Sequence, residues 1–482
     1  MSSSPKAGKL GHRNQNMPLA RKSVKALTAL GIHGRFDLYQ EFHEGINILH
    51  GKNGTGKTTV LHILANLLNG DFRRFAFLNF SFIELELSDG SKVALSKCIE
   101  DGDSCIRIDK GEFSPDFISI IKAKEALRPG PMGNDTPVPE QRRILESTYS
   151  NLRPIIPTAY FPAFRTLIEA AGRHDGLDPY YAARMGRSSR NQPLFTSTTF
   201  SRRFFGDFVP WINYPSPYEV GQRISSEALQ ALNDVSSTDR ALLSKAFLEI
   251  FSTLSSSGTS TRQHDNPDAI LSAIKDLSEQ LSMLGISNGP SSDEQVYSTL
   301  RTMIPSVRFR EGLEEVYAPV LQIYREALEE RVRVQNSSSS LIRLYLDSVN
   351  NFLEGKRLSI RRRDDIPIPL VQVEFEDNTF GSIQSLSSGE RQIVTIIYAS
   401  THMSGQEVVL IDEPEISLHI DWQIKLLPSL SEQLNDKQII TCTHSPVIAS
   451  GYEEQMVELR LAASQNQAES VTKEEDDSEE LL

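Results

Sequence analysis

Residues 51–58 read Gly-Lys-Asn-Gly-Thr-Gly-Lys-Thr, which matches the phosphate-binding pattern GxxxxGK[ST]. The apolar run at 45–50 predicts a buried strand before this loop, and apolar residues between 60 and 68 predict a helix after it. In such a loop, glycines let backbone N–H groups approach phosphate, and the helix N-terminus adds partial positive charge. The context favours a nucleotide site over an ordinary Gly-rich turn. Its expected phosphate-binding residues are Gly51, Asn53, Gly54, Gly56, Lys57, Thr58 and Thr59.

A second motif consists of four apolar residues, 408–411, followed by Asp412 and Glu413. A buried strand would deliver both carboxylates at its carboxyl end, where open α/β sheets bind their ligands. We expect Asp412 to share Mg²⁺ with the Thr58 hydroxyl. Glu413 would point elsewhere and polarise the attacking water. Standing alone, two acids after a strand would also fit an ordinary turn.

A third stretch, Leu-Ser-Ser-Gly-Glu at 386–390, precedes a helical pattern and therefore predicts a helix N-terminus that could contact phosphate. Ser-Gly turns are common, so the stretch is weak evidence by itself. Beside the other two motifs it resembles the LSGGQ-type signature of ABC ATPases, with Ser for the first Gly and Glu for Gln. Residues 415–419 and His444 stand where that family has its D-loop and its switch histidine.

The resemblance implies an enzyme that hydrolyses ATP with Mg²⁺, in which Glu413 is the catalytic base and His444 senses the γ-phosphate. It also implies a dimer that sandwiches ATP, because the signature acts on nucleotide held by the other subunit. The signature residues expected to act in trans are Ser387, Ser388, Gly389 and Glu390. The family's Q-loop glutamine has no clear counterpart, and Arg165 occupies its expected place.

The stretches GKNGTGKTTVLHIL, YFPAFRTLIE, NNFLEGKRLSI, SLSSGERQIV, IDEPEISLHIDWQ and THSP are similar to stand-alone ABC-type ATPases with AAA_15/AAA_21-like domains. They resemble the ATPase subunits of Septu, retron and PARIS antiphage systems. This resemblance implies an ATP-driven switch that controls a separate effector, a nuclease or toxin, in defence against mobile elements. Two alternatives stay open: an SMC-like DNA-repair ATPase, and a scaffold that binds ATP with negligible turnover.

The α/β pattern opens the chain, stops and resumes, which predicts an α/β ABC-type P-loop ATPase head with a mixed sheet, interrupted by a helical insertion. Residues 24–50 suggest two strands, and further strand signals lie at 81–87, 92–95, 105–108, 155–161, 366–376, 408–411 and 438–442. Helical periodicity covers 225–232, 239–254, 267–284, 295–303 and 311–334, with Pro319 able to kink or split the last helix.

The expected organisation has six parts. They are a basic disordered tail at 1–22, an ATPase lobe with the phosphate loop at 23–165, an Arg/aromatic connecting segment at 166–216, a helical insertion at 217–357, a second ATPase lobe with signature, acidic pair and switch histidine at 358–460, and an acidic disordered tail at 461–482.

Composition narrows the function classes further. The net charge of −13 over 482 residues argues against a protein that coats duplex DNA, because phosphate binding is largely electrostatic. We expect no membrane association and a cytoplasmic location, since no apolar run reaches 18 residues and the first residues lack a secretory pattern. The three cysteines form no CxxC pair, which argues against a zinc knuckle or a zinc hook. Between 173 and 205, arginines alternate with aromatic residues, which fits a solvated loop, a protein interface or a nucleic-acid site, and nucleic-acid binding is left open.

Overall fold

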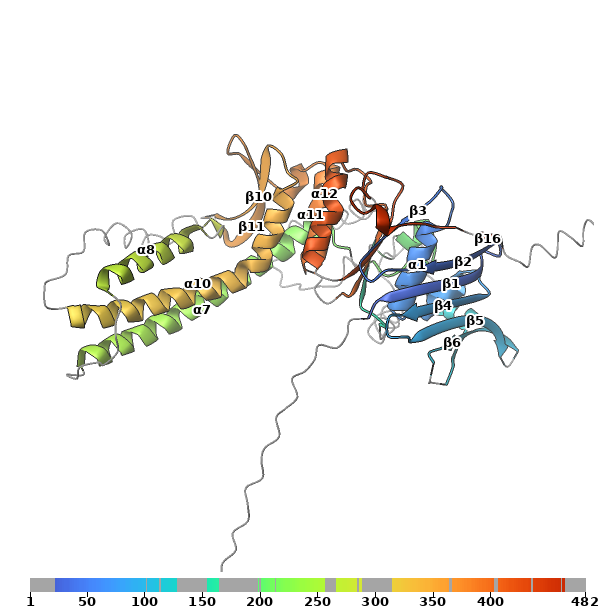
Figure 1. The fold of residues 1–482 in the computed structure, drawn as a ribbon, viewed down its shortest axis with the longest axis horizontal. Coiled ribbons are helices and arrows are strands. Elements are labelled where there is room, and N and C mark those ends of the chain that lie inside the picture. The colour runs from blue at the N-terminus through green and yellow to red at the C-terminus, as the bar shows by residue number, and fades with distance from the viewer. Residues whose placement is uncertain are drawn as a thin grey trace, which may run out of the picture.

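The structure is a computed structural model of the chain. It describes residues 22–100, 102–111, 114–127, 154–163, 198, 201–212, 214–255, 266–283, 286–287, 314–363, 366–402, 406–434, 437–460 and 462–463. A head of two sheets lies at one end, and a helical arm extends from it (Figure 1). The α/β fold expected from the sequence is confirmed.

A parallel sheet of five strands forms the centre of the head, in the order β15-β3-β14-β13-β8. Its strands are β3 (Ile46–His50), β8 (Thr158–Phe161), β13 (Val408–Asp412), β14 (Gln438–Cys442) and β15 (Met456–Glu458). All of its strand pairs are parallel. Every residue of β8, β13 and β14 is buried, as expected of strands covered on both faces. The carboxyl ends of β3, β13 and β14 therefore meet at one edge.

An antiparallel sheet of seven strands forms the second layer, in the order β16-β2-β1-β4-β5-β6-β7. Its strands are β1 (Val24–Ile32), β2 (Phe36–Glu41), β4 (Phe82–Leu87), β5 (Lys92–Glu100), β6 (Asp103–Asp109), β7 (Asp116–Ser119) and β16 (Ala462–Ala463). The antiparallel sheet thus stands beside the parallel one in the head. A short 3-10 helix, η1 (Phe72–Phe77), and helix α2 (Ile120–Leu127) lie beside this layer.

Helix α1 (Lys57–Leu68) joins these layers. Ten of its twelve residues are buried, so it is covered on nearly all sides. It packs on β8, β13 and β14, and its residues share one apolar core with the antiparallel sheet. Burial lowers the pKa of His62 to about 3, so its imidazole is neutral and contacts the Tyr160 hydroxyl on β8 at 2.8 Å. This packing fixes the helix that begins at Lys57.

The other face of the parallel sheet is covered by α11 (Ser388–His402) and α12 (Ile420–Leu434), which pack on each other (Figure 1). A third sheet, β12-β11-β10-β9, lies beside them. It consists of β9 (Ile286–Ser287), β10 (Lys356–Arg363), β11 (Ile366–Phe375) and β12 (Phe380–Gly381). Short 3-10 helices occur at η3 (Ile383–Ser385) and η4 (Glu453–Gln455).

The arm consists of α7 (Pro217–Ser255), α8 (Pro267–Met283) and α10 (Glu314–Asn350), with α7 and α10 side by side (Figure 1). Its base contacts the helix that follows the signature. Tyr398 of α11 donates a hydrogen bond to Glu227 of α7 at 3.1 Å, and Tyr345 of α10 donates to the Val394 carbonyl at 3.1 Å. The arm and the signature helix are therefore packed together. In the part of the chain that the structure describes, no helix is both long and apolar enough to cross a bilayer.

The helices of the arm are longer than the sequence predicts. The two helices expected at 225–232 and 239–254 are one helix, α7, and the helix expected to end at 334 continues to Asn350. In both, hydroxyls satisfy helix carbonyls: Ser237 donates to Asp234, and Ser339 donates to Gln335. Pro319 lies inside α10 without splitting it. The helix expected at 295–303 lies outside the described residues.

Two strand predictions also need correction. Residues 24–50 form three strands rather than two, because β1 and β2 make a hairpin through Gly31–Gly34 before β3 begins. The acidic tail predicted from residue 461 includes strand β16, in which Ala462 pairs with Asp37 of β2. The remainder of that tail, and the basic tail before residue 22, lie outside the described residues.

Candidate nucleotide-binding site

The phosphate loop lies between β3 and α1, as the sequence predicts. Gly54 and Gly56 have φ values of 82° and 74°, in the left-handed region that disfavours residues with a Cβ. Gly56 is also the N-cap of α1, so the loop turns directly into the helix. The arrangement aims backbone N–H groups and the helix N-terminus at one space.

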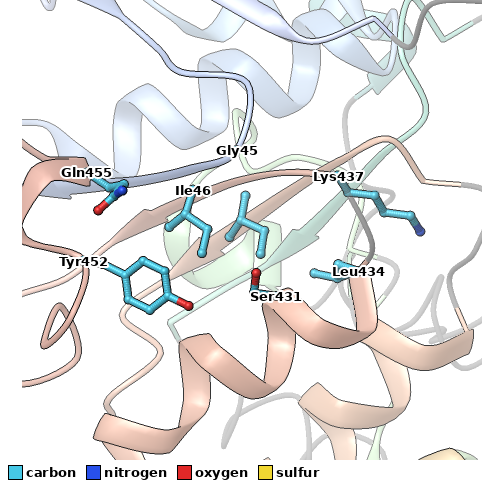
Figure 2. A pocket seen from close by; sticks show the side chains of 8 residues that line it. Gly45, Ile46, Ser431, Leu434, Lys437, Tyr452 and Gln455 are labelled. Atoms are coloured by element: carbon cyan, nitrogen blue, oxygen red, sulfur yellow. The ribbon is translucent and has the colours of Figure 1, made fainter.

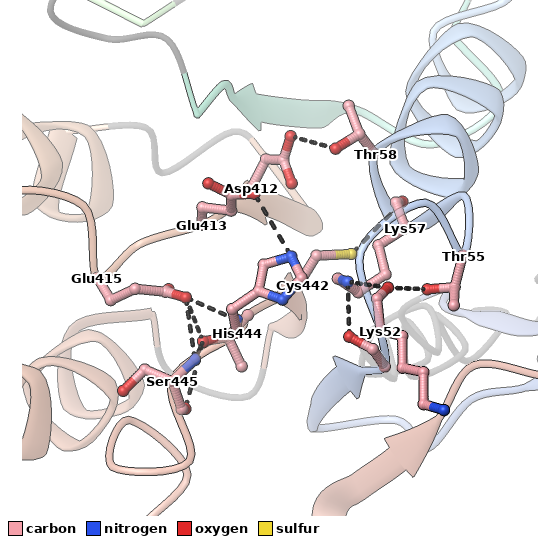
Figure 3. Close-up of polar contacts among 12 residues, drawn as sticks. Lys52, Thr55, Lys57, Thr58, Asp412, Glu413, Glu415, Cys442, His444 and Ser445 are labelled. Atoms are coloured by element: carbon pink, nitrogen blue, oxygen red, sulfur yellow. Dashed lines mark hydrogen bonds and ion pairs between the residues drawn. The ribbon is translucent and has the colours of Figure 1, made fainter.

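Lys57 holds the phosphate loop together and connects it to the end of β14. Lys57 is 6% exposed, and its ammonium donates to the Gly51 carbonyl at 2.9 Å and the Lys52 carbonyl at 3.1 Å (Figure 3). Below the loop, burial raises the pKa of the Cys442 thiol well above its usual value, so the thiol donates to the Lys57 carbonyl at 3.5 Å. The loop is therefore preformed around the lysine.

The Thr58 hydroxyl donates to Asp412 Oδ2 at 2.9 Å, across 354 residues of sequence. Asp412 is 1% exposed and ends β13, two strands away from β3 in the sheet order. A hydroxyl and a carboxylate this close fit a Mg²⁺ ion, which takes few protein ligands and keeps water and phosphate oxygens for the rest. The residue types at this point therefore suit a magnesium–nucleotide complex.

Glu413 and His444 face each other across the same edge of the sheet. Glu413 Oε1 lies 3.7 Å from His444 Nε2, and the two side chains are 31% and 37% exposed (Figure 3). Glu413 has φ 46°, in the left-handed region that few residues other than glycine adopt. A carboxylate and an imidazole that both reach solvent can contact a water or a phosphate oxygen.

A cavity of about 730 Å³ brings most of the predicted residues together. Its walls include Glu413, His444 and the loop residues from Asn53 to Thr59, whereas Gly51 contributes its carbonyl to Lys57. The lining also includes His33 and Phe36 of the β1–β2 hairpin, which the sequence did not point to. The aromatic ring and imidazole of that hairpin could contact a base, but reading 24–50 as two strands hid the hairpin.

The signature residues do not line this cavity. Ser387 and Ser388 are exposed at the start of α11, whereas Gly389 and Glu390 are buried. Glu390 accepts a hydrogen bond from the Ser387 N–H at 2.8 Å, and its own N–H donates to the Ser387 hydroxyl at 3.3 Å. These reciprocal bonds are a capping box. The Glu390 side chain thus serves its own helix.

Lys356 of β10 adds an ion pair to Glu390, at 3.0 Å. Burial raises the pKa of Glu390, but the Ser387 N–H and the Lys356 ammonium outweigh it and hold the pKa below its ordinary value. The carboxylate is therefore charged and engaged. Of the four predicted signature residues, the two serines are the ones whose side chains face solvent.

Gly389 is where the signature helix meets the turn after β13. A Cβ at this position would lie 2.4 Å from the Ser417 carbonyl oxygen, and Gln392 fixes the same turn by donating to the Pro414 carbonyl at 2.9 Å. The glycine therefore permits a backbone contact that no other residue would.

We expect Gly389→Ala to lower the free energy of unfolding by about 1–3 kcal/mol, because overpacking forces the backbone apart. Chemical denaturation would measure the change. Gly45→Ala is the matched control, since a Cβ there meets nothing within 4 Å. Equal stability of both variants would contradict this account of Gly389.

A second cavity, of about 350 Å³, lies at the opposite end of the parallel sheet (Figure 2). Its lining combines apolar side chains such as Ile46 and Leu434 with Ser431, Tyr452 and Lys437. It lies where β3 and β14 begin rather than where they end. Ligands of parallel sheets bind at the carboxyl ends, so the chemistry points to the first cavity.

The structure describes only part of the Arg/aromatic segment predicted at 166–216. Arg165 and most of the Arg/aromatic segment lie outside the described residues. Within it, Arg202 is buried and donates to the Val209 carbonyl at 2.8 Å, so it supports the local fold. Phe204 and Phe205 are 65% and 48% exposed.

The chain is similar in sequence to known ATPases. Residues 229–449 match the AAA_15 family of AAA ATPase domains. This stretch contains most of the arm, the signature, the acidic pair and His444, but not the phosphate loop. A probable ATPase of retron Ec83 from Escherichia coli is 26% identical over 150 residues, 28% of this chain and 26% of that protein. The match thus spans about a quarter of that relative's length. The resemblance to AAA_15-type and retron ATPases is confirmed.

Solved structures similar to the chain include two Smc head domains. One, from Pyrococcus furiosus, has an extended coiled coil and is bound to the C-terminal domain of ScpA. It is 12% identical, covers 94% of this chain and 99% of its own, and has a TM-score of 0.38. The other, from Pyrococcus yayanosii, has a coiled coil and joint, is 12% identical, covers 94% and 100%, and has a TM-score of 0.35.

Proposed function

We propose that the protein binds ATP with Mg²⁺ and hydrolyses it, that ATP is sandwiched in a dimer, and that this switch controls an effector protein in defence against mobile elements. The chain is related to AAA-type ATPases, one of them from a retron.

One observation carries the proposal: the hydrogen bond between Thr58 and Asp412. It joins the phosphate loop to the acidic pair at the carboxyl edge of the parallel sheet, beside the 730 Å³ cavity. Phosphate-cradling N–H groups, a lysine and a Mg²⁺-type ligand pair then converge on one space. That combination suits a nucleoside triphosphate.

Glu413 and His444 favour hydrolysis over a scaffold that holds ATP. Both line the cavity, and a carboxylate there can orient and deprotonate an attacking water. His444 Nε2 lies within reach of Glu413 and can contact an oxygen of the terminal phosphate. Bound Mg²⁺ would polarise the phosphate oxygens, and Thr58 and Asp412 would hold it.

The dimer is supported by the exposure of Ser387 and Ser388 at a helix N-terminus that does not line the cavity of its own chain. A second copy could present these groups to the phosphates. The effector role rests on the retron relative. An adjacent gene for a nuclease or toxin would support it.

We expect Lys57→Ala to weaken ATP binding by about 10–100-fold, the scale of a lost charge-assisted hydrogen bond. The substitution also leaves the Gly51 and Lys52 carbonyls without their donor. Titration with a fluorescent ATP analogue in the presence of Mg²⁺ would measure the affinity.

Lys437→Ala is the matched control, because it removes a lysine from the second cavity. ATP affinity should stay at the wild-type value in that variant. Equal affinity in wild type and Lys57→Ala would disprove the nucleotide site, and ATP binding without turnover above background would favour the scaffold.

A further inference from the structure

Glu415 connects the two loops that follow β13 and β14. One of its oxygens, Oε1, accepts hydrogen bonds from the Thr443 hydroxyl at 2.8 Å, the His444 N–H at 2.6 Å and the Ser445 N–H at 3.1 Å (Figure 3). The donors lie 28 to 30 residues further along the chain. Hydrogen bonds to an ionised acceptor are about twice as strong as neutral ones. A single carboxylate therefore sets the path of the loop that carries His444.

The loop after β14 depends on such contacts because it leaves the sheet at this point. The Thr443 N–H still donates to Leu49 of β3 at 3.1 Å, and residue 444 is in neither helix nor strand. Ser445 makes a second contact, because its hydroxyl donates to Gln423 of α12 at 2.7 Å. His444 thus stands between two anchored residues, and its own N–H is bound by Glu415.

The backbone of His444 is held by a hydrogen bond to Glu415, whereas its imidazole is partly exposed to solvent. Its side chain is 37% exposed, and it lies 3.7 Å from Glu413. The direction of an exposed side chain follows the backbone that bears it, and a reacting group displaced by about 1 Å can lose about 10²-fold in rate. The backbone bonds from Glu415 are therefore placed to fix the reach of His444 into the cavity.

We propose that Glu415 is a positioning residue, which holds His444 in the geometry needed for ATP hydrolysis and does not itself touch the nucleotide. The inference rests on the proposed function, because it assigns His444 a role at the phosphates. It deepens that function by naming the residue that orients the histidine. It also links the nucleotide side of the sheet to the turn at 415–419, against which Gly389 of the signature helix packs.

Glu415→Ala is expected to lower kcat by about 10–100-fold, while the affinity for ATP stays within about twofold, because positioning is lost and the phosphate loop is intact. Glu415→Gln keeps a side-chain oxygen that can accept from the His444 N–H. This conservative variant should therefore recover at least part of the rate. Steady-state kinetics and ATP titration would separate the two quantities.

A double-mutant cycle with His444→Ala tests the route of the effect. If Glu415 acts through His444, the double variant should be no slower than His444→Ala alone. If the two losses multiply, Glu415 acts independently and the inference is wrong. Glu453→Ala is the matched control, since Glu453 also accepts a backbone N–H, from Gly451 at 3.0 Å, but does not line the nucleotide cavity.

Hydrogen exchange gives a readout that needs no turnover. Amides of the peptide spanning 443–446 should exchange faster in Glu415→Ala, with smaller change in Glu415→Gln. Unchanged exchange there would overturn the inference. If Glu415→Ala does not fold, turnover, ATP affinity and hydrogen exchange are compared between wild type and Glu415→Gln, and these differences test the inference.

The failure of the inference can be told from the failure of the proposed function. A wild-type protein without turnover, or one unaffected by His444→Ala, would refute hydrolysis through His444 and with it the positioning role. If the wild type hydrolyses ATP, and the rate falls in His444→Ala but not in Glu415→Ala, only the role of Glu415 is overturned.

Discussion

In the Glu413→Gln variant, ATP hydrolysis is expected to fall by about 10²-fold or more, the scale of a lost general base. Glutamine keeps the shape of the side chain but cannot accept a proton from water. The Thr58–Asp412 bond and the lysine contacts of the phosphate loop do not involve Glu413. ATP binding should therefore survive, and the ATP-bound state should accumulate. Phosphate release under single-turnover conditions would measure the loss.

The control for this prediction is Glu454→Gln, which neutralises an exposed glutamate outside the cavity. It should hydrolyse ATP at the wild-type rate. Wild-type turnover in Glu413→Gln would mean that another group activates the water. A loss of ATP affinity in parallel with turnover would mean that Glu413 supports binding instead.

The parts of the site that lie in short motifs were predictable from the sequence. The phosphate loop needs its glycines and lysine within eight residues, and the acidic pair needs an apolar strand directly before it. Their meeting across 354 residues was also predictable, because parallel strands end at one edge of a sheet. The structure places Thr58 and Asp412 as that rule requires.

Features that depend on contacts between distant segments were not predictable in this way. The hairpin that brings His33 and Phe36 to the cavity was missed because Gly31–Gly34 was placed between two strands rather than inside one hairpin ahead of a third. The three bonds of Glu415 join loops about 30 residues apart, and no local pattern marks them.

The sequence around Glu390 fits two interpretations, a helix capping box and a nucleotide-binding signature. Ser387 and Glu390 have the S-x-x-E spacing of a capping box, and the structure places them in one. The motif resemblance instead suggested a contact with nucleotide in the other subunit. The helices expected at 225–232, 239–254 and 311–334 likewise leave out residues that continue α7 and α10, where serine hydroxyls bond to helix carbonyls.

The Ser388→Arg variant is expected to lose ATP hydrolysis by about 10²-fold or more, the scale of losing donors to a developing charge. Ser388 is exposed at the first turn of α11 and belongs to no wall of its own chain's cavity. The long side chain should exclude a second subunit's nucleotide, while each chain still binds ATP through its own phosphate loop. Phosphate release and ATP titration would measure both. Ser252→Arg, at an exposed serine of the arm, is the control and should match wild type.

Mixing two inactive variants tests whether the loss acts in trans. Ser388→Arg retains Lys57, and Lys57→Ala retains the signature, so a heterodimer contains one composite site with both intact. Recovered turnover on mixing would show that one chain's signature serves the other chain's ATP. Crosslinking of Glu413→Gln in ATP adds a test that needs no turnover, because Ser388 should then lie beside the partner's nucleotide. If crosslinks never place Ser388 there, the sandwich is wrong and the phosphate loop acts within a single chain.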